Sequence, residues 1–250
     1  MSVNFKDHFS GHADLYAQAR PRYPGALFEW IARQSPMRQC VWDAACGNGQ
    51  ASVALAEKFD RVVATDPSAQ QITQAQRHPR IEYRVEPAEH SSMEDRSVDA
   101  VTVAQALHWF DLPRFVEEVR RVARPGALFA AWSYAGCNVG AKVDAVIARL
   151  YEGILGEYWP PERRSVEEGY ASLEIPFPQI EAPAFEMRTD WNAEQLLAYL
   201  RSWSAAQRYR KATGSDAVAE ISEELRSAWG DAHSSRAVRW KLALRAARVD

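Results

Sequence analysis

The sequence predicts an α/β protein built on a parallel sheet with helices on both faces. Between residues 39 and 134, short runs rich in β-branched residues alternate with stretches of helical periodicity. This alternation is typical of parallel sheets, because parallel strands are joined by crossovers that usually contain a helix. The 250 residues, 47% hydrophobic and 25% charged, are also sufficient to bury a substantial core.

The elements of this core follow one another in a regular order. Predicted strands occupy the segments CVWDAA, RVVATD, IEYRVE, VDAVTVAQAL and ALFAAW. Predicted helices occupy QASVALAEKF, SAQQITQAQR and LPRFVEEVRRVA, and Arg124-Pro125-Gly126 ends the last of them. Right-handed crossovers would bring the loops after the strands to one edge of the sheet, where open α/β sheets bind ligands.

The flanks of the core predict further elements of the same domain. Residues 14 to 34 have the pattern of two helices separated by the prolines of ARPRYPG. The segments after Trp132 are a helix in AKVDAVIARLYEGIL, an irregular proline-rich stretch, a strand in FEMRTDW, helices in NAEQLLAYLRSWSA and SDAVAEISEELRSAW, and a last strand in AVRWKLALRAARV. Because no flexible linker intervenes, we expect one domain over residues 1–250, with a core at about 36–134 and helical caps at about 1–35 and 135–235.

Composition argues against several classes of protein. The net charge of −3 supplies no basic field for nucleic acid or for an anionic membrane. The N-terminus lacks an apolar leader, and no stretch approaches ~20 apolar residues, so we expect neither a signal peptide nor a membrane span. Cys40, Cys46 and Cys137 form no CxxC pair, and the histidines show no ligand spacing. We therefore expect a reduced, cytoplasmic protein without a metal.

The segment VWDAACGNGQ predicts a strand that runs into a glycine-containing turn and could hold a nucleotide. A dinucleotide fingerprint beginning at Gly47 and Gly49 would place its third glycine at position 52, where the chain has Ser52. Asp43 would repel a pyrophosphate but attract an ammonium group, whereas the amides that open a helix suit a carboxylate. A ligand with both an α-amine and an α-carboxylate therefore fits better than NAD. The alternative is an ordinary turn with Asp43 as a cap.

Asp66 ends the second predicted strand, 66 − 43 = 23 residues after Asp43. An acid at this distance from a glycine loop is placed to accept the ribose hydroxyls of an adenosyl group. Asp66-Pro67-Ser68 also fits a simple helix start, and the two roles are compatible.

These motifs, taken together, resemble class I S-adenosylmethionine-dependent methyltransferases. The matching segments are DAACGNG, VVATDPS, EPAEH, VDAVTVAQALHWF and RVARPGALFAAW. The segments FSGHADLYAQARPRYP and SWSAAQRY are similar to the subgroup that contains trans-aconitate methyltransferase. The resemblance implies a Rossmann-like, mostly parallel seven-stranded sheet with an antiparallel last strand, and N- and C-terminal helical caps. It also implies S-adenosyl-L-methionine as cofactor and a small-molecule acceptor.

The resemblance assigns the methionine end of the cofactor to Asp43 and to the amides of residues 46–49. Tyr16 and Arg20 would close over it, with Arg20 pairing to the carboxylate. Asp66 would hold the ribose. The further cofactor candidates are Ala45, Cys46, Gly47 and Gly49 in the loop, Pro67, Ser68, Ala88 and Glu89 around the adenine, and Gln105 and Ala106 beside the sulfonium.

One position departs from the family pattern D-x-G-x-G-x-G. Ala45 occupies the place of the first glycine. Alanine fits there at a negative φ, so we expect a small packing adjustment and retained cofactor binding.

The acceptor side is less specific in sequence. His108, after the fourth strand, is the candidate catalytic residue, as general base or hydrogen-bond donor, and the alternative is a structural histidine. Trp109, Phe110, Trp132 and Tyr134 could line a π-rich pocket or belong to the core. Arg163 and Arg164, in a possible lid formed by YWPPERR, could recognise an acidic substrate, although exposed arginines after prolines are common.

The favoured hypothesis is methyl transfer to a small molecule, with a carboxylate as the expected acceptor. A carboxylate is already deprotonated at neutral pH and needs no base, whereas an amine or hydroxyl usually does. The alternatives are a cofactor-binding protein without turnover and, disfavoured by Ser52 and Asp43, an NAD-linked oxidoreductase. Neither oligomeric state nor the identity of the acceptor has a signal in the sequence.

Overall fold

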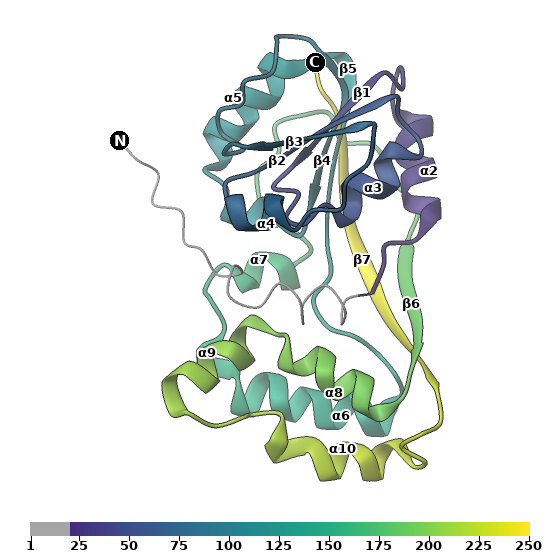
Figure 1. The fold of residues 1–250 in the computed structure, drawn as a ribbon, viewed down its shortest axis with the longest axis vertical. Helices are drawn as coiled ribbons and strands as arrows, with labels where there is room; N and C mark the ends of the chain where they lie inside the picture. Colours follow the sequence, from purple (N-terminus) through teal and green to yellow (C-terminus); the bar gives the residue numbers. More distant parts are fainter. Residues whose placement is uncertain (1–20) are drawn as a thin grey trace.

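The computed structural model describes residues 21–250, which form a seven-stranded sheet and a group of cap helices beside it (Figure 1). The strands lie in the order β3-β2-β1-β4-β5-β7-β6. Their bounds are β1 Cys40–Ala44, β2 Arg61–Asp66, β3 Ile81–Val85, β4 Val98–Ala104, β5 Ala123–Ser133, β6 Phe185–Trp191 and β7 Arg236–Arg248.

Strand directions confirm the predicted sheet. β1 pairs in parallel with both β2 and β4, β2 pairs in parallel with β3, and β4 pairs in parallel with β5. The last strand, β7, runs antiparallel to both of its neighbours, β5 and β6. The chain order reverses at β1, where crossovers leave toward β2 on one side and β4 on the other. This is the switch point at which α/β sheets of this kind bind ligands.

Helices cover both faces of the sheet because its strands are apolar on both sides. One face packs against α2 (Gly25–Gln34) and α3 (Gln50–Ala56), with Leu27, Ile31 and Leu55 fully buried. The other face packs against α5 (Leu112–Val122), whose Phe115 and Val119 are fully buried. Burial on both faces is what the near-continuous apolar runs of parallel strands require.

A helical cap stands beyond the end of the sheet, and β6 and β7 extend to it from the sheet (Figure 1). Its helices are α6 Ala141–Ala148, which continues as a wider turn over Arg149–Ile154, α8 Ala193–Arg201, α9 Ser204–Thr213 and α10 Ser222–Trp229. The short helix α7 (Arg163–Glu167) lies between the cap and the sheet. The cap has its own apolar interior, in which Leu196, Leu200 and Trp240 are fully buried.

Some elements differ from expectation. The segment NAEQLLAYLRSWSA is divided between α8 and α9, and the helix predicted over SDAVAEISEELRSAW begins as α10 only at Ser222. The helix predicted over SAQQITQAQR is only α4 (Ala69–Thr73), because Ile72 is the one large apolar side chain that this segment can bury. Arg124-Pro125-Gly126 ends α5 as expected but already belongs to β5. The first predicted N-terminal helix lies outside the described residues. Among the helices of residues 21–250, none is long and apolar enough to cross a membrane.

Candidate active site

The loop from β1 to α3 contains three residues with left-handed backbone. The φ angles are 53° at Ala45, 57° at Gly47 and 85° at Gly49. The expectation of a negative φ at Ala45 is therefore wrong. Because the tight turn into α3 needs this conformation, the alanine is held where a glycine would be unstrained.

Gly49 is required for a second reason. A Cβ atom at this position would lie 2.2 Å from the Tyr83 hydroxyl oxygen, so even alanine would require the Tyr83 side chain to move. Tyr83 thereby packs directly on the turn that opens α3.

Asp66 connects the end of β2 to the glycine loop. Its carboxylate accepts one hydrogen bond from the Gly47 amide and one from the Ser68 amide, each at 2.8 Å. Ser68 in turn caps α4. The Asp66 carboxylate is thus oriented by backbone groups at the ligand-binding edge of the sheet, and 7% of the residue is exposed.

The loop amides are largely occupied within the protein. The Cys46 amide donates to the carbonyl of Thr65, the Gly47 amide to Asp66, and the Gly49 amide to the carbonyl of Cys46. Of the four amides expected to hold a methionine group, the Asn48 amide alone has no partner among residues 21–250. A cofactor contact through several of these amides would need the loop to rearrange.

Asp43 lies deeper than its predicted role requires. The residue is fully buried, and its carboxylate accepts hydrogen bonds from Ser52 Oγ at 2.6 Å and Thr102 Oγ1 at 3.0 Å. Burial, helped by the nearby charge of Asp66, raises the pKa of Asp43 to about 6. The side chain joins α3 to β4, and direct contact with a ligand is closed to it in this conformation.

The remaining cofactor candidates are spread around the same edge. Ala88 and Ala106 are buried, Pro67 is half-buried, and Glu89 accepts a hydrogen bond from the Asp111 amide at 3.0 Å. Gln105 has a left-handed φ of 59°, and its side chain donates to the Tyr134 carbonyl at 2.8 Å. Tyr16 and Arg20 lie outside the described residues. The contacts of these residues with a cofactor stay predictions.

A recess that is partly open to solvent lies between the end of β4 and the cap, with about 650 Å³ of empty space when its open mouth is included. Its lining residues are Gln105, His108, Trp109, Tyr134, Ala135, Trp159, Pro160, Arg163, Val166, Tyr199, Trp203 and Ser204. Sheet and cap therefore contribute to one site.

The recess separates the aromatic candidates into two groups. Trp109 and Tyr134 line it as predicted pocket residues. Trp132 is fully buried and packs edge-on against Tyr23 at 5.5 Å, so it is a core residue rather than a pocket wall. Phe110 lies against Phe115 at 4.6 Å and likewise does not line the recess. Alternation along β5 explains Trp132, because its side chain points to the α2 face of the sheet.

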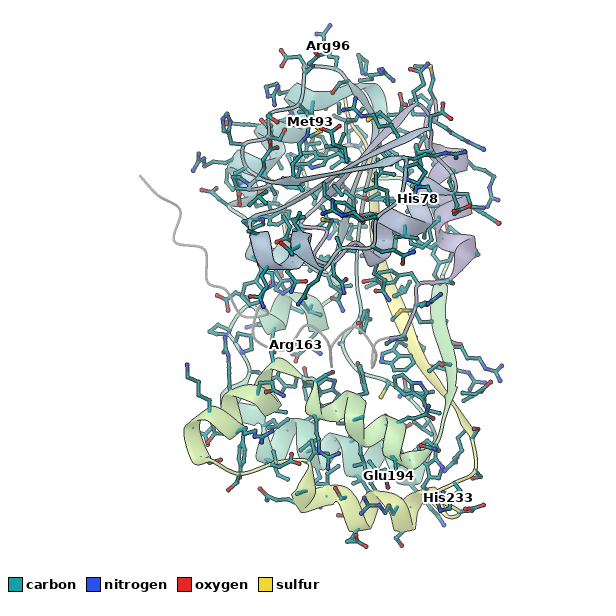
Figure 2. The ribbon with its side chains drawn as sticks, in the orientation of Figure 1. His78, Met93, Arg96, Arg163, Glu194 and His233 are labelled. Carbon is teal, nitrogen blue, oxygen red and sulfur yellow. The ribbon has the colours of Figure 1, made fainter. Side chains whose placement is uncertain are left out.

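The two neighbouring arginines, Arg163 and Arg164, lie in different environments. Arg163 lies between the sheet and the cap helices (Figure 2) and lines the recess. It donates to the Ala135 carbonyl at 2.6 Å and to the Tyr151 hydroxyl at 2.8 Å, and its guanidinium lies 4.7 Å from the centre of the Trp159 ring. The side chain of Arg164 is 83% exposed and pairs with Glu168.

His108 lies in the recess beside Arg163. Its Nδ1 atom is 3.2 Å from the Tyr170 hydroxyl. Burial, with a further contribution from the positive charge of Arg163, lowers the pKa of His108 to about 4. The imidazole is therefore neutral at neutral pH, as a general base or a neutral hydrogen-bond donor must be.

Several recess residues were not anticipated as site residues. Trp203 and Tyr199 come from the cap. Tyr170, which follows α7, does not line the recess itself but contacts His108 behind it. Trp159 and Trp203 belong to YWPPERR and SWSAAQRY, segments whose sequence stands out, but nothing in either segment indicates that they meet. Tyr170 has no sequence signal for its position.

The fold and this edge of the sheet define a class of α/β proteins that bind a nucleoside-containing cofactor at the switch point. Residues 42–131 match the family model described as a methyltransferase domain. A Dictyostelium discoideum protein named as a methyltransferase is 33% identical over 231 residues, which cover 91% of this chain and 88% of that protein.

Two further comparisons agree. A solved structure of a type II methyltransferase from Anaeromyxobacter dehalogenans is 51% identical, with a TM-score of 0.88, and covers 92% of this chain and 98% of its own. A Saccharomyces cerevisiae protein named as an S-adenosylmethionine-dependent methyltransferase is 31% identical over 128 residues, which cover 48% of this chain and 44% of that protein. The chain belongs to the S-adenosylmethionine-dependent methyltransferases. This family assignment rules out the alternative of an NAD-linked oxidoreductase. Membership of the subgroup that contains trans-aconitate methyltransferase stays a prediction.

The residues at the sheet edge fit this cofactor. The left-handed turn over residues 45–49 carries only small side chains apart from Asn48, and the Asn48 amide is the one loop amide without a partner among residues 21–250. Asp66 presents a carboxylate oriented by two amides, the group that ribose hydroxyls need as acceptor. Gln105, which we expect beside the sulfonium, is one of the residues that line the recess.

Proposed function

We propose that this methyltransferase methylates a carboxylate on a small acceptor with an apolar body, forming a methyl ester. The observation that carries the proposal is Arg163, a partly buried cation in the wall of an aromatic recess. The acceptor's carboxylate would pair with Arg163, and its apolar part would lie among the aromatic side chains of the recess.

The charge of Arg163 is only weakly neutralised within the described residues. Its nearest carboxylate, Glu167, is 3.8 Å away and 43% exposed. Nε and one terminal nitrogen donate to Tyr151 and Ala135, which leaves the other terminal nitrogen without a partner among residues 21–250. A guanidinium with a free N–H in a half-desolvated site favours a planar anion such as a carboxylate.

The walls around Arg163 favour an apolar or aromatic body for the acceptor. Trp159 and Trp203 lie 5.6 Å apart between ring centres, and Tyr199 packs edge-on against Trp203 at 5.9 Å. These rings give a large apolar surface that loses little conformational entropy on binding. On the opposite side, Trp109 and Tyr134 would face the cofactor's positive sulfur, which aromatic faces stabilise.

The chemistry asks little of the protein beyond alignment and exclusion of water. The cofactor supplies a methyl group on a positively charged sulfur. An acceptor carboxylate oxygen forms the new bond to the methyl carbon in line with the breaking bond, whose electron pair remains on sulfur, and no proton is released. Arg163 would orient the carboxylate, and the aromatic walls would limit the access of water.

Within this proposal, Asp66 would hold the ribose hydroxyls, and Asp43 would act indirectly by fixing α3 against β4. Gln105 would stand beside the sulfur, because its strained backbone directs it into the recess. Strain of this kind is common at functional positions and agrees with that role.

The test is methyl ester formation from a panel of aromatic and aliphatic carboxylic acids, each paired with the matching amide, amine and alcohol. We expect product from acids alone. Arg163→Gln should raise KM for the best acid by about 10- to 100-fold, because a charge-assisted hydrogen bond contributes about 1.5–3 kcal/mol. Arg164→Gln is the matched control on the same helix and should change KM by less than about twofold, since surface pairs contribute little.

Methylation of amines or alcohols in place of acids would overturn the proposal. Equal losses in Arg163→Gln and Arg164→Gln would also contradict it, because only Arg163 lines the recess.

A further inference from the structure

Tyr170 is a buried hydroxyl with an unusual backbone. The residue is fully buried, has a φ of 64° and follows Gly169, which is also left-handed. Its amide donates to the carbonyl of Ser165 at 2.7 Å, and Arg245 donates to its carbonyl at 2.5 Å. These contacts hold an L-residue in a strained conformation, which indicates that the position of its side chain matters.

The hydroxyl of Tyr170 lies 3.2 Å from His108 Nδ1, which is its hydrogen-bond partner within the described residues. If Nδ1 carried the hydrogen, the buried O–H group of Tyr170 would have no acceptor there, and an unsatisfied buried hydroxyl costs about 1–3 kcal/mol. The O–H hydrogen is therefore assigned to the bond with Nδ1.

This assignment determines the tautomer of His108. A neutral imidazole whose Nδ1 accepts a hydrogen bond carries its hydrogen on Nε2. The ring is held in place by Trp109 at 4.6 Å and by stacking on Tyr170 at 5.9 Å. Nε2 has no hydrogen-bond partner among residues 21–250, and His108 is one of the residues that line the recess.

We propose that Tyr170 is a positioning residue that locks His108 as a neutral Nε2–H donor to the acceptor's anion, so that His108 is not a general base. The donor role rests on the proposed function, whereas the tautomer rests on the hydrogen bond of the Tyr170 hydroxyl alone. Two donors would then converge on one carboxylate, Arg163 from the cap side and His108 from the sheet side.

The arrangement has a consequence for selectivity. The single lone pair of neutral His108 is directed at Tyr170, so no basic nitrogen faces the acceptor. Burial and Arg163 both oppose a second proton on the ring, and His108 therefore stays neutral. The site would accept groups that are already ionised at neutral pH and would leave alcohols and amines unreacted.

The first test measures the tautomer without any acceptor. Long-range ¹H–¹⁵N correlation spectra of the full chain at pH 7 should show His108 as the Nε2–H form, identified by the signal that is missing in His108→Gln. Tyr170→Phe removes the donor to Nδ1 and should shift His108 toward a mixture of the two tautomers. An Nδ1–H form in the wild type, or no change in Tyr170→Phe, would overturn the lock.

The second test separates a donor from a base. In His108→Gln, the side-chain amide can place an N–H near the position of Nε2 but cannot take up a proton, whereas His108→Leu offers neither. We expect kcat/KM for the best acid to fall less than about tenfold in His108→Gln and at least about tenfold further in His108→Leu, the loss expected for one hydrogen bond to a charged group. Equal losses in the two variants would exclude the donor role.

The two tests also distinguish the inference from the proposed function. An Nε2–H tautomer that depends on Tyr170, in an enzyme that methylates no carboxylic acid, would keep the lock and reject the acceptor class. Methylation of acids by an enzyme whose His108 is the Nδ1–H tautomer would keep the acceptor class and reject the lock.

Discussion

Asp43 shows how a single buried side chain links the site to stability. Its carboxylate has two hydroxyl donors and no cation beside it in the described structure. Two hydrogen bonds do not compensate for complete burial, which is why its pKa rises. The free-energy cost of burying this carboxylate is offset because its hydrogen bond to Ser52 fixes the first turn of α3, which follows directly on the glycine loop.

The raised pKa predicts a dependence of stability on pH. Between the ordinary pKa of 3.8 and the folded value of about 6, the folded state binds the proton of Asp43 more tightly than the unfolded state. This contribution is therefore fully present below pH 3.8 and is lost as the pH rises through 6, by about 3 kcal/mol in total.

Asp43→Asn cannot titrate and should remove this slope. The measurement is the free energy of unfolding by urea at several pH values from 4 to 7, as the difference between wild type and variant. The difference should move in favour of the variant as the pH rises. A difference that is constant over this range would show that Asp43 has an ordinary pKa.

At the scale of elements, the turn between β1 and α3 is the part of the site that departs most clearly from its family. Ala45 adopts a left-handed φ that costs an L-residue about 1–2 kcal/mol. The neighbouring strand and helix are well packed and hold the alanine in this conformation. The turn therefore stores strain at the place where we expect the cofactor to bind.

Ala45→Gly should relieve this strain. Glycine loses more backbone entropy on folding, by about 0.4–1 kcal/mol, so the net stabilisation should be about 0.5–1 kcal/mol. Urea unfolding measures it, and Ala44→Gly in the adjacent strand is the control, which should destabilise because Ala44 is fully buried. A loss of stability in Ala45→Gly would mean that the alanine methyl contributes packing that outweighs the strain.

At the scale of the whole molecule, β6 and β7 both extend from the sheet to the cap (Figure 1). β7 pairs with β5 over Ala243–Arg248 and with β6 over Arg236–Leu242. The recess is bounded by both parts, so a ligand held there would couple them. We propose that core and cap unfold as one domain.

Ligand-linked unfolding checks this proposal. S-adenosylmethionine at ~100 times its Kd should add about 2.7 kcal/mol to the stability, which raises Tm by about 5–10 °C for a chain of this length. Circular dichroism and tryptophan fluorescence should report the same shifted transition. A second unfolding transition whose midpoint does not change when the cofactor is added would indicate that the cap unfolds independently of the core. Asp66→Ala should abolish the shift if Asp66 holds the ribose.

Much of the fold was predictable because the patterns that indicate it are each contained in a short stretch of sequence. Such patterns include the alternation of strands and helices, the prolines and glycines that end helices, and the glycine loop. Asp66 was also identifiable, because its place at the end of β2 follows from a fixed spacing. The conformation of Ala45 was not, because φ at a turn depends on how strand, helix and Tyr83 pack around it.

The family, the class of sheet and the edge at which we expect the cofactor follow from the sequence alone. Which residues line the recess depends on how distant parts of the chain pack together. Arg163 and Arg164 are adjacent and chemically identical, yet one lies in the recess and the other in solvent. His108 and Tyr170 meet across 62 residues. Contacts of this kind depend on how the cap packs against the strand ends. Packing between distant segments produces no periodic pattern of residues by which a single sequence could reveal it.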